Sequence, residues 1–92
     1  MQLPVTVPGL LSASVGGARK VRVEGATLDD ALGDLKSRHP NLRIHVWDET
    51  GKLREHVLVY LNDESIEWID DARARKLKEG DELHIIQAVS GG

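Results

Sequence analysis

Apolar residues occupy every second position in two segments near the start of the chain. Leu3, Val5 and Val7 form the first series, and Val21 and Val23 form the second. A period of two is typical of a strand that buries one of its faces. The pattern predicts two strands, which we expect to pair antiparallel after a loop that ends in a Gly-Gly turn at residues 16–17.

A helix is predicted after the second strand. The hydroxyl of Thr27 can cap the first turn, and Asp29 and Asp30 place carboxylates where the helix dipole is positive. We expect the helix to end near His39, because Pro40 disfavours helical geometry in the residue before it. The positions i, i+3, i+4 and i+7 form one apolar stripe, made of Leu28, Ala31, Leu32 and Leu35.

The second half of the chain holds further strand patterns. Residues 56–61 form an almost continuous apolar run, which predicts an interior strand that ends at the turn-forming residues 62–63. A short edge strand is expected at 65–68. Residues 70–78 read as a short helix or turn that carries Leu77 inward, and 82–89 as the last strand.

Residues 41–55 are open to two interpretations. Leu42, Ile44 and Val46 alternate as they would in a strand, yet a short irregular excursion fits the segment as well. Residues 49–52 have the composition of a turn in either case.

The apolar stripe of the helix must pack on another surface, and one face of a mixed sheet is the surface available. The order of elements predicts an α+β protein of the β-grasp (ubiquitin-like) type, with four or five strands packed on one main helix. The first and last strands would then lie side by side and parallel. The length of 92 residues fits a single domain, 1–92, in which we expect 88–92 to be a flexible C-terminal tail.

Composition excludes several classes of function. The chain has no cysteine, so it has no disulfide, thiolate metal site or cysteine nucleophile. A net charge of −3 argues against nucleic acid as a partner. The absence of a long apolar run or a signal-like N-terminus predicts a cytoplasmic protein without membrane contact. Residues 1–46 carry 6 basic and 4 acidic side chains, a net charge of +2, whereas residues 47–92 carry 6 basic and 11 acidic side chains, a net charge of −5. This asymmetry could steer a basic partner toward the second half, or simply mark a solvated acidic surface.

Other reactive side chains do not form recognisable sites in the sequence. The four histidines lack the spacing of metal ligands, so we expect no metal site at His39, His45, His56 or His84. Trp47 and Trp68 are interpreted as packing residues in the core or at its rim.

The end of the chain carries the most specific signal. A Gly-Asp turn at 80–81, a final strand and a short tail of small residues ending in Gly91-Gly92 resemble the end of the MoaD/ThiS-type ubiquitin-like sulfur carriers. Residues 39–42 (His-Pro-Asn-Leu) and 57–64 are similar to that family as well, so the resemblance covers the whole chain. Within the family, the sequence is most similar to MoaD-like proteins and to carriers for cysteine biosynthesis.

The resemblance implies a function for the terminal carboxylate of Gly92. It implies that an adenylating enzyme of the MoeB/ThiF type uses ATP to activate this group, and that sulfur then converts it to a thiocarboxylate. The protein would be a co-substrate rather than an enzyme, would bind no cofactor itself, and would donate sulfur to a downstream synthase for molybdopterin or cysteine biosynthesis. Because glycine has no Cβ atom, Gly91 and Gly92 could pass through a channel of the enzyme that is too narrow for a side chain. The alternatives are a modifier conjugated to lysines through Gly92 and a non-covalent β-grasp interaction module.

A docking surface for the partner is expected on the sheet. If alternate residues of the third and last strands face the helix, then Leu58, Tyr60, His84 and Ile86 gather on the opposite face. Such a partly apolar patch marks a partner site, unless residues 41–55 cover it. Val89 and Ser90 would extend the contact along the tail.

Overall fold

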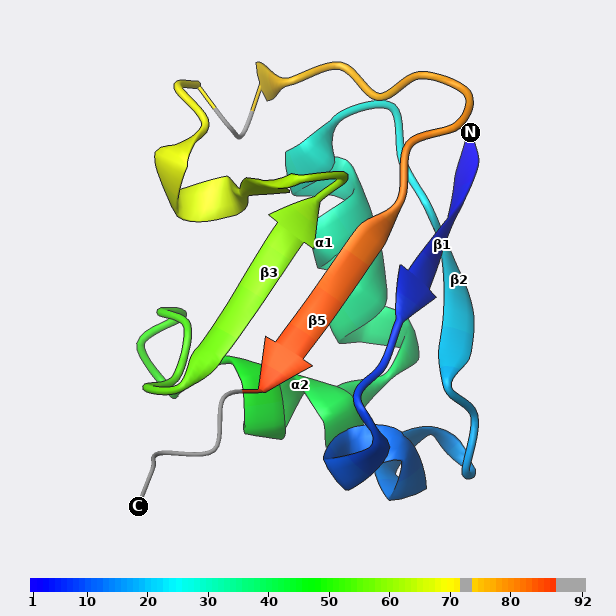
Figure 1. Cartoon of the computed structure of the whole chain (residues 1–92), viewed down its shortest axis with the longest axis vertical. Helices are drawn as coiled ribbons and strands as arrows, with labels where there is room; N and C mark the ends of the chain where they lie inside the picture. Colours follow the sequence, from blue (N-terminus) through cyan, green and yellow to red (C-terminus); the bar gives the residue numbers. More distant parts are fainter. Residues whose placement is uncertain (72–73, 88–92) are drawn as a thin grey trace.

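Five strands form one mixed sheet in the order β2-β1-β5-β3-β4, with helices on one side of it (Figure 1). The structure is a computed structural model that describes residues 1–71 and 74–87. The strands are β1 (Gln2–Thr6), β2 (Lys20–Glu24), β3 (Val57–Leu61), β4 (Glu64–Ser65) and β5 (Leu83–Gln87). The helices are η1 (Gly9–Val15), α1 (Leu28–Arg38), α2 (Pro40–Val46) and η2 (Ile66–Trp68), where η marks a 3₁₀ helix.

The pairing of the strands confirms the predicted β-grasp. β1 pairs antiparallel with β2 and parallel with β5, with Val5 opposite Leu83. β5 also pairs antiparallel with β3 along the whole of both strands. The first and last strands of the chain therefore lie at the centre of the sheet.

Helix α1 packs its apolar stripe against the sheet as predicted. Leu28, Ala31 and Leu35 are buried, and the Thr27 hydroxyl accepts a hydrogen bond of 3.2 Å from the backbone N–H of Asp30. The helix ends at Arg38, one residue before the expected boundary. Gly25 allows the chain to approach this helix closely, because a Cβ atom there would lie 2.5 Å from the backbone nitrogen of Ala31.

The strand interpretation of residues 41–46 is wrong, because this segment is part of helix α2. Pro40 occupies the first turn of this helix, where its missing N–H costs no hydrogen bond. Leu42 and Val46, four positions apart, are both buried in the core, while Ile44 is 52% exposed. The turn expected at 49–52 is present, with Gly51 at a φ of 88° and Asp48 accepting hydrogen bonds from the backbone of Thr50 and Lys52.

Several connections differ from the sequence-based expectation. The loop before β2 contains the 3₁₀ helix η1, which buries Leu11, and Gly16 and Gly17 follow it with positive φ. The expected strand at 65–68 is mostly the 3₁₀ helix η2, because β4 is only two residues long. Leu77 is buried, as predicted.

The two tryptophans lie in opposite environments. Trp47 is buried in the core, in agreement with a packing role. The interpretation of Trp68 as a packing residue is wrong, because it is 77% exposed. Across residues 1–71 and 74–87, each helix is too short or too polar to cross a lipid bilayer.

Candidate functional site

The face of the sheet opposite α1 carries the four residues predicted to form a docking surface. Leu58 lies opposite Ile86 and Tyr60 lies opposite His84 in the register of β3 and β5, so the four side chains form two adjacent cross-strand pairs. We call this set the outer-face patch. The alternate residues face α1 and are buried: Val57, Val59, Leu61, Leu83 and Ile85.

Residues 41–55 leave the outer-face patch uncovered. α2 buries Leu42 and Val46 in the core, and Figure 1 shows no part of this segment in front of β3 and β5. Ile86 is 42% exposed, and the other three members of the patch are half-buried. The patch is therefore an accessible apolar surface with two polar members.

His84 is held in the outer-face patch by two neighbours. Its Nδ1 lies 3.0 Å from the Oγ1 of Thr6 on β1, within hydrogen-bond distance. Its Nε2 lies 3.6 Å from a carboxylate oxygen of Glu82, which becomes an ion pair when the imidazole is protonated. These contacts fix the ring at the junction of the parallel strands β1 and β5.

A network of hydrogen bonds fixes the start of β5, and the sequence patterns did not reveal it. The Asn62 amide donates to Asp81 Oδ1 at 3.0 Å, and its oxygen accepts from the backbone N–H of Glu82 at 2.9 Å. The backbone N–H of Lys78 donates to Asp81 Oδ2 at 2.9 Å. Burial of Asp81 favours its neutral form, but the hydrogen bonds from Asn62 and Lys78 outweigh it, so the pKa of this carboxyl lies below its usual value.

Asn62 can make these contacts because of its backbone conformation. Its φ is 57°, in the left-handed region that asparagine tolerates better than most residues. The turn between β3 and β4 is thereby tied to the turn before β5. The network aligns β5 with β3, and so sets the direction in which the chain leaves the sheet.

The predicted reactive tail follows directly after β5. Gly91 and Gly92, with Val89 and Ser90, lie outside the described residues. The last described residue, Gln87, lies opposite Val57 at the beginning of β3. A hollow of about 460 Å³ opens beside it, lined by Ile44, His45, Arg54, Glu55, Val57 and Gln87.

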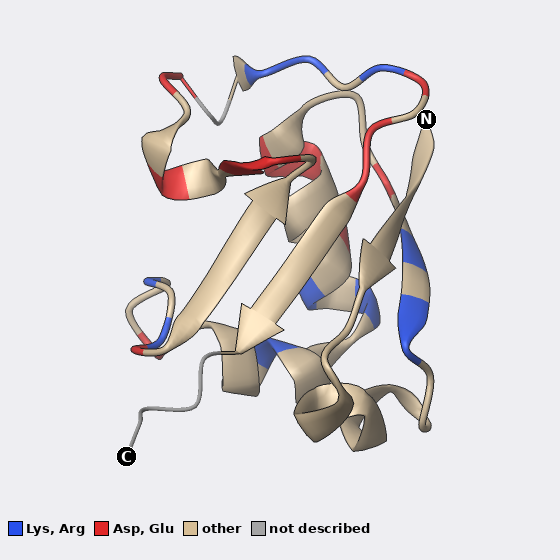
Figure 2. Ribbon diagram, in the orientation of Figure 1, with Lys and Arg blue, Asp and Glu red and all other residues tan. Residues whose placement is uncertain are grey.

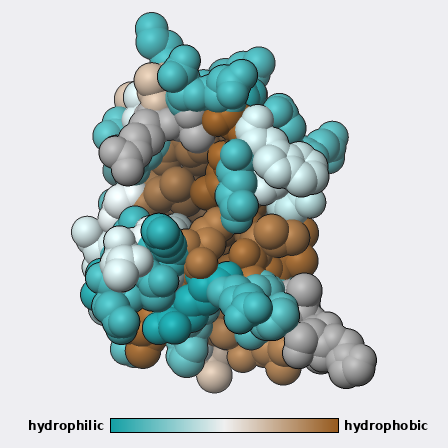
Figure 3. All heavy atoms as spheres, turned by 90° about the vertical axis from the view of Figure 1, so that its left-hand side faces the viewer, coloured by the Kyte–Doolittle hydropathy of each residue, from teal (hydrophilic) through white to brown (hydrophobic). Residues whose placement is uncertain are grey.

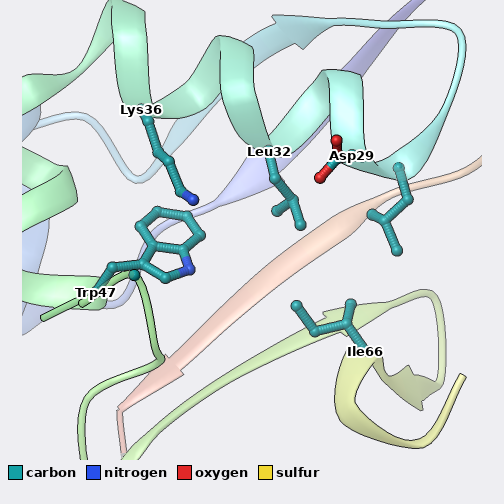
Figure 4. Close-up of a pocket in the computed structure, with 7 residues that line it drawn as sticks. Asp29, Leu32, Lys36, Trp47 and Ile66 are labelled. Carbon is teal, nitrogen blue, oxygen red and sulfur yellow. The ribbon is translucent and has the colours of Figure 1, made fainter. Parts of the chain in front are cut away.

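A second hollow lies on the α1 side of the molecule (Figure 4). It has a volume of about 200 Å³ and lies between α1, Trp47 and Ile66. The Lys36 ammonium lies 4.6 Å from the centre of the Trp47 ring, at cation–π distance. Figure 3 shows apolar residues in a recess on this side of the molecule, with hydrophilic residues above and below it. The remaining residues that line this hollow are Leu28, Asp29, Leu32 and Gly51.

Charged residues are distributed unevenly over the two ends of the sheet. Figure 2 shows acidic residues concentrated where β3 ends and β5 begins, next to a basic stretch around 75–78. The chain leaves the sheet at the opposite end, where one basic and one acidic side chain, Arg54 and Glu55, line the hollow beside Gln87. Within residues 1–71 and 74–87, no three histidine or acidic side chains come close enough together to hold a metal ion.

Comparisons with known sequences identify relatives along the whole chain. The model of the ThiS family matches residues 5–92. The sulfur carrier protein CysO of Mycobacterium tuberculosis is 31% identical over 94 residues, with all of both chains covered. The small archaeal modifier protein 1 of Haloferax volcanii is 39% identical over 83 residues, which cover 87% of this chain and 90% of that protein.

Solved structures show the same fold. CysO in the BexX/CysO complex of Amycolatopsis orientalis gives a TM-score of 0.79 at 33% identity, covering 98% of this chain and 99% of that one. The SAMP1 protein of Haloferax volcanii gives a TM-score of 0.78 at 33% identity, with both chains fully covered. Sequence and fold agree over nearly the whole length, and the chain therefore belongs to the ThiS family of ubiquitin-like sulfur carriers.

Proposed function

We propose that the protein carries sulfur as a thiocarboxylate at the C-terminus of Gly92. The observation that carries the proposal is the position of β5, which lies at the centre of the sheet, pairs with β3 along its whole length and with β1 at its start, and is followed in the sequence by the five residues that end in Gly91-Gly92. A rigid sheet at the base of the tail gives a partner enzyme a fixed surface from which to locate the terminal carboxylate.

The chemistry requires activation of this carboxylate. A free α-carboxyl has a pKa of about 3.3–3.7, so at neutral pH it is a carboxylate that nucleophiles do not attack. Reaction with ATP would form an acyl-adenylate and release pyrophosphate. The terminal sulfur of a persulfide would then form the new C–S bond as AMP leaves, and a second thiol would cleave the resulting disulfide to free the thiocarboxylate.

The partner in the first step is an adenylating enzyme of the MoeB/ThiF type, which also binds the ATP. We place its docking site on the outer-face patch, because Leu58 and Ile86 offer an accessible apolar surface on the strands that lead to the tail. Val89 and Ser90 would continue the contact toward the reaction centre. The relative from Amycolatopsis orientalis forms a complex with BexX, which supports a role in protein–protein contact for this fold.

The similarity to CysO favours cysteine biosynthesis as the pathway that receives the sulfur. Molybdopterin biosynthesis is the next candidate. In either pathway, a synthase would take the sulfur from Gly92 after the activating enzyme has left.

Conjugation to lysines is a second candidate function. The similarity to small archaeal modifier protein 1 is the observation that favours it, at 39% identity. Activation of Gly92 is the same in both functions, and only the nucleophile differs. Higher-mass conjugates that disappear with a Gly92 deletion in cells would support the modifier function.

Intact mass spectrometry tests the carrier function. Protein incubated with its adenylating enzyme, ATP and a persulfide donor should gain the mass difference between one sulfur and one oxygen atom. Replacement of Gly92 by alanine should strongly slow formation of the adenylate, because a Cβ would enter the channel that carries the tail. Wild-type protein that consumes no ATP with any adenylating enzyme of its own genome would refute the proposal.

A further inference from the structure

The hollow where the chain leaves β5 contains a buried acceptor to which none of the described residues donates. The Oε1 atom of Gln87 has no hydrogen-bond partner among residues 1–71 and 74–87, although it is shielded from solvent. Buried polar side-chain atoms are satisfied in most native structures, so an exception needs an explanation. An acceptor that turns outward to a partner protein on docking is such an explanation.

The other side chains of the hollow are suited to an interface. Ile44 is 52% exposed, although it is a large apolar residue. Arg54 is anchored there, because its Nε donates a hydrogen bond of 2.6 Å to the carbonyl of Ile44. Among the described residues, neither Arg54 nor Glu55 forms a salt bridge, so the guanidinium keeps its charge available to a carboxylate.

The position of the hollow restricts what can cover it. Only residues 88–92 separate Gln87 from the end of the chain, and five extended residues span at most about 17 Å. An enzyme that reacts at Gly92 must therefore extend to the neighbourhood of Gln87. This geometric argument rests on the proposed function.

We propose that the adenylating enzyme makes a second contact in this hollow, separate from the outer-face patch. On docking, the Gln87 side chain would turn outward, so that Oε1, which is shielded in the free protein, accepts an N–H or O–H hydrogen bond from the enzyme. The enzyme would also place a carboxylate near Arg54 and cover Ile44 with an apolar side chain. This contact holds the base of the tail and thereby aims the last residues into the enzyme. Gln87, Arg54 and Ile44 are positioning residues in this mechanism, and none of them touches the reacting atoms.

The test measures adenylation of Gln87→Met and Ile44→Ser by an adenylating enzyme of the MoeB/ThiF type from the same genome, with pyrophosphate release as readout. We expect the KM for the carrier to rise about fivefold in each variant, since each loses about one hydrogen bond or one apolar contact, while kcat stays within about twofold. The thermal midpoint of Gln87→Met should be equal to that of the wild type or higher, because the substitution removes an unsatisfied buried acceptor.

Two controls separate this inference from the proposed function. Leu10→Ser changes a residue that is 71% exposed on η1 and should leave KM unchanged. If wild type is adenylated and Gly92→Ala is not, the proposed function stands. In that case, a wild-type KM for Gln87→Met and Ile44→Ser, or an equal rise for Leu10→Ser, would overturn the second contact alone.

Discussion

The Nδ1 atom of His84 lies 3.0 Å from the hydroxyl of Thr6, which is 78 positions earlier in the chain. The two residues are partners in the parallel ladder between β1 and β5. Their contact links the beginning of the chain to its last strand, on the face that we assign to partner docking. β5 pairs with β3 along its whole length and with β1 at its first two residues, so β3 alone holds the end of β5 from which the tail leaves.

Replacement of Ile86 by aspartate should weaken docking of the adenylating enzyme far more than it weakens the fold. Ile86 is 42% exposed, so its charge stays solvated in the free protein but would be buried against an apolar partner surface. We expect about a tenfold or larger rise in Kd, typical of an interface anchor. Isothermal titration calorimetry measures this, with Leu10→Asp as a matched exposed control. Unchanged affinity for Ile86→Asp would contradict the docking assignment.

Leu83→Ala should strongly destabilise the protein. Leu83 is fully buried at the centre of the sheet, where truncation leaves a cavity as well as losing apolar contact. The expected loss is about 2–5 kcal/mol in the free energy of unfolding, measured in urea. Ile86→Ala, on the opposite face of the same strand, should cost less than about 1 kcal/mol. Similar losses for the two variants would contradict the assignment of the two faces.

Two glycine substitutions should change stability in opposite directions. Gly25→Ala forces a Cβ to within 2.5 Å of the Ala31 backbone, so we expect a loss of about 1–3 kcal/mol. Gly33→Ala lies in α1 with nothing within 4 Å of the new methyl group, and alanine is the better helix former by about 1 kcal/mol. Thermal unfolding followed by circular dichroism should show a lower midpoint for the first variant and a higher one for the second.

Asp81 should contribute stability that depends on pH. Its pKa is lowered in the folded protein from the ordinary value of 3.8, since hydrogen bonds from Asn62 and Lys78 stabilise the ionised form against the effect of burial. The contribution is therefore complete above pH 3.8 and is lost as the pH falls through the lower folded pKa. Asp81→Asn should cost about 1 kcal/mol at pH 7, because an amide cannot accept from both neighbours.

Urea unfolding between pH 2 and pH 7 measures this effect. The difference in stability between wild type and Asp81→Asn should shrink as the solution is acidified through the pKa of Asp81. Asp29→Asn, at an exposed position in the first turn of α1, serves as the control. A difference between wild type and Asp81→Asn that stays constant over the whole range would contradict the role given to the ionised carboxylate.

Local periodicity was sufficient to predict most of the secondary structure and the two faces of the sheet. The alternation in β1 and β2 identifies their buried residues, because side chains of a strand point to opposite faces in turn. In β3, which is apolar throughout, the same geometry separates two faces but does not say which one packs on α1. Thr27 and the stripe beginning at Leu28 predict α1 within one residue of its end. The outer-face patch could be predicted for the same reason, since it consists of the alternate positions of two apolar strands.

The segment 41–46 shows the limit of this reasoning. Leu42, Ile44 and Val46 satisfy a period of two, while Leu42 and Val46 alone satisfy the spacing of one helical turn. A helix of seven residues is too short to be stable by itself. Packing of Leu42 and Val46 into the core stabilises α2, so the tertiary structure decides between the two patterns.

The sequence by itself determined the capped helix α1 and its buried stripe, the order of α1 and the main strands, and the Gly-Gly end that points to a carrier. The tertiary structure alone decided what surrounds the base of the tail. Asn62 reaches Asp81 across 19 positions, and Arg54 and Ile44 meet Gln87 in one hollow only after β3 and β5 have paired in register. Periodicity reports the environment of a residue along its own strand or helix, whereas such contacts depend on the pairing of segments that are distant in the chain.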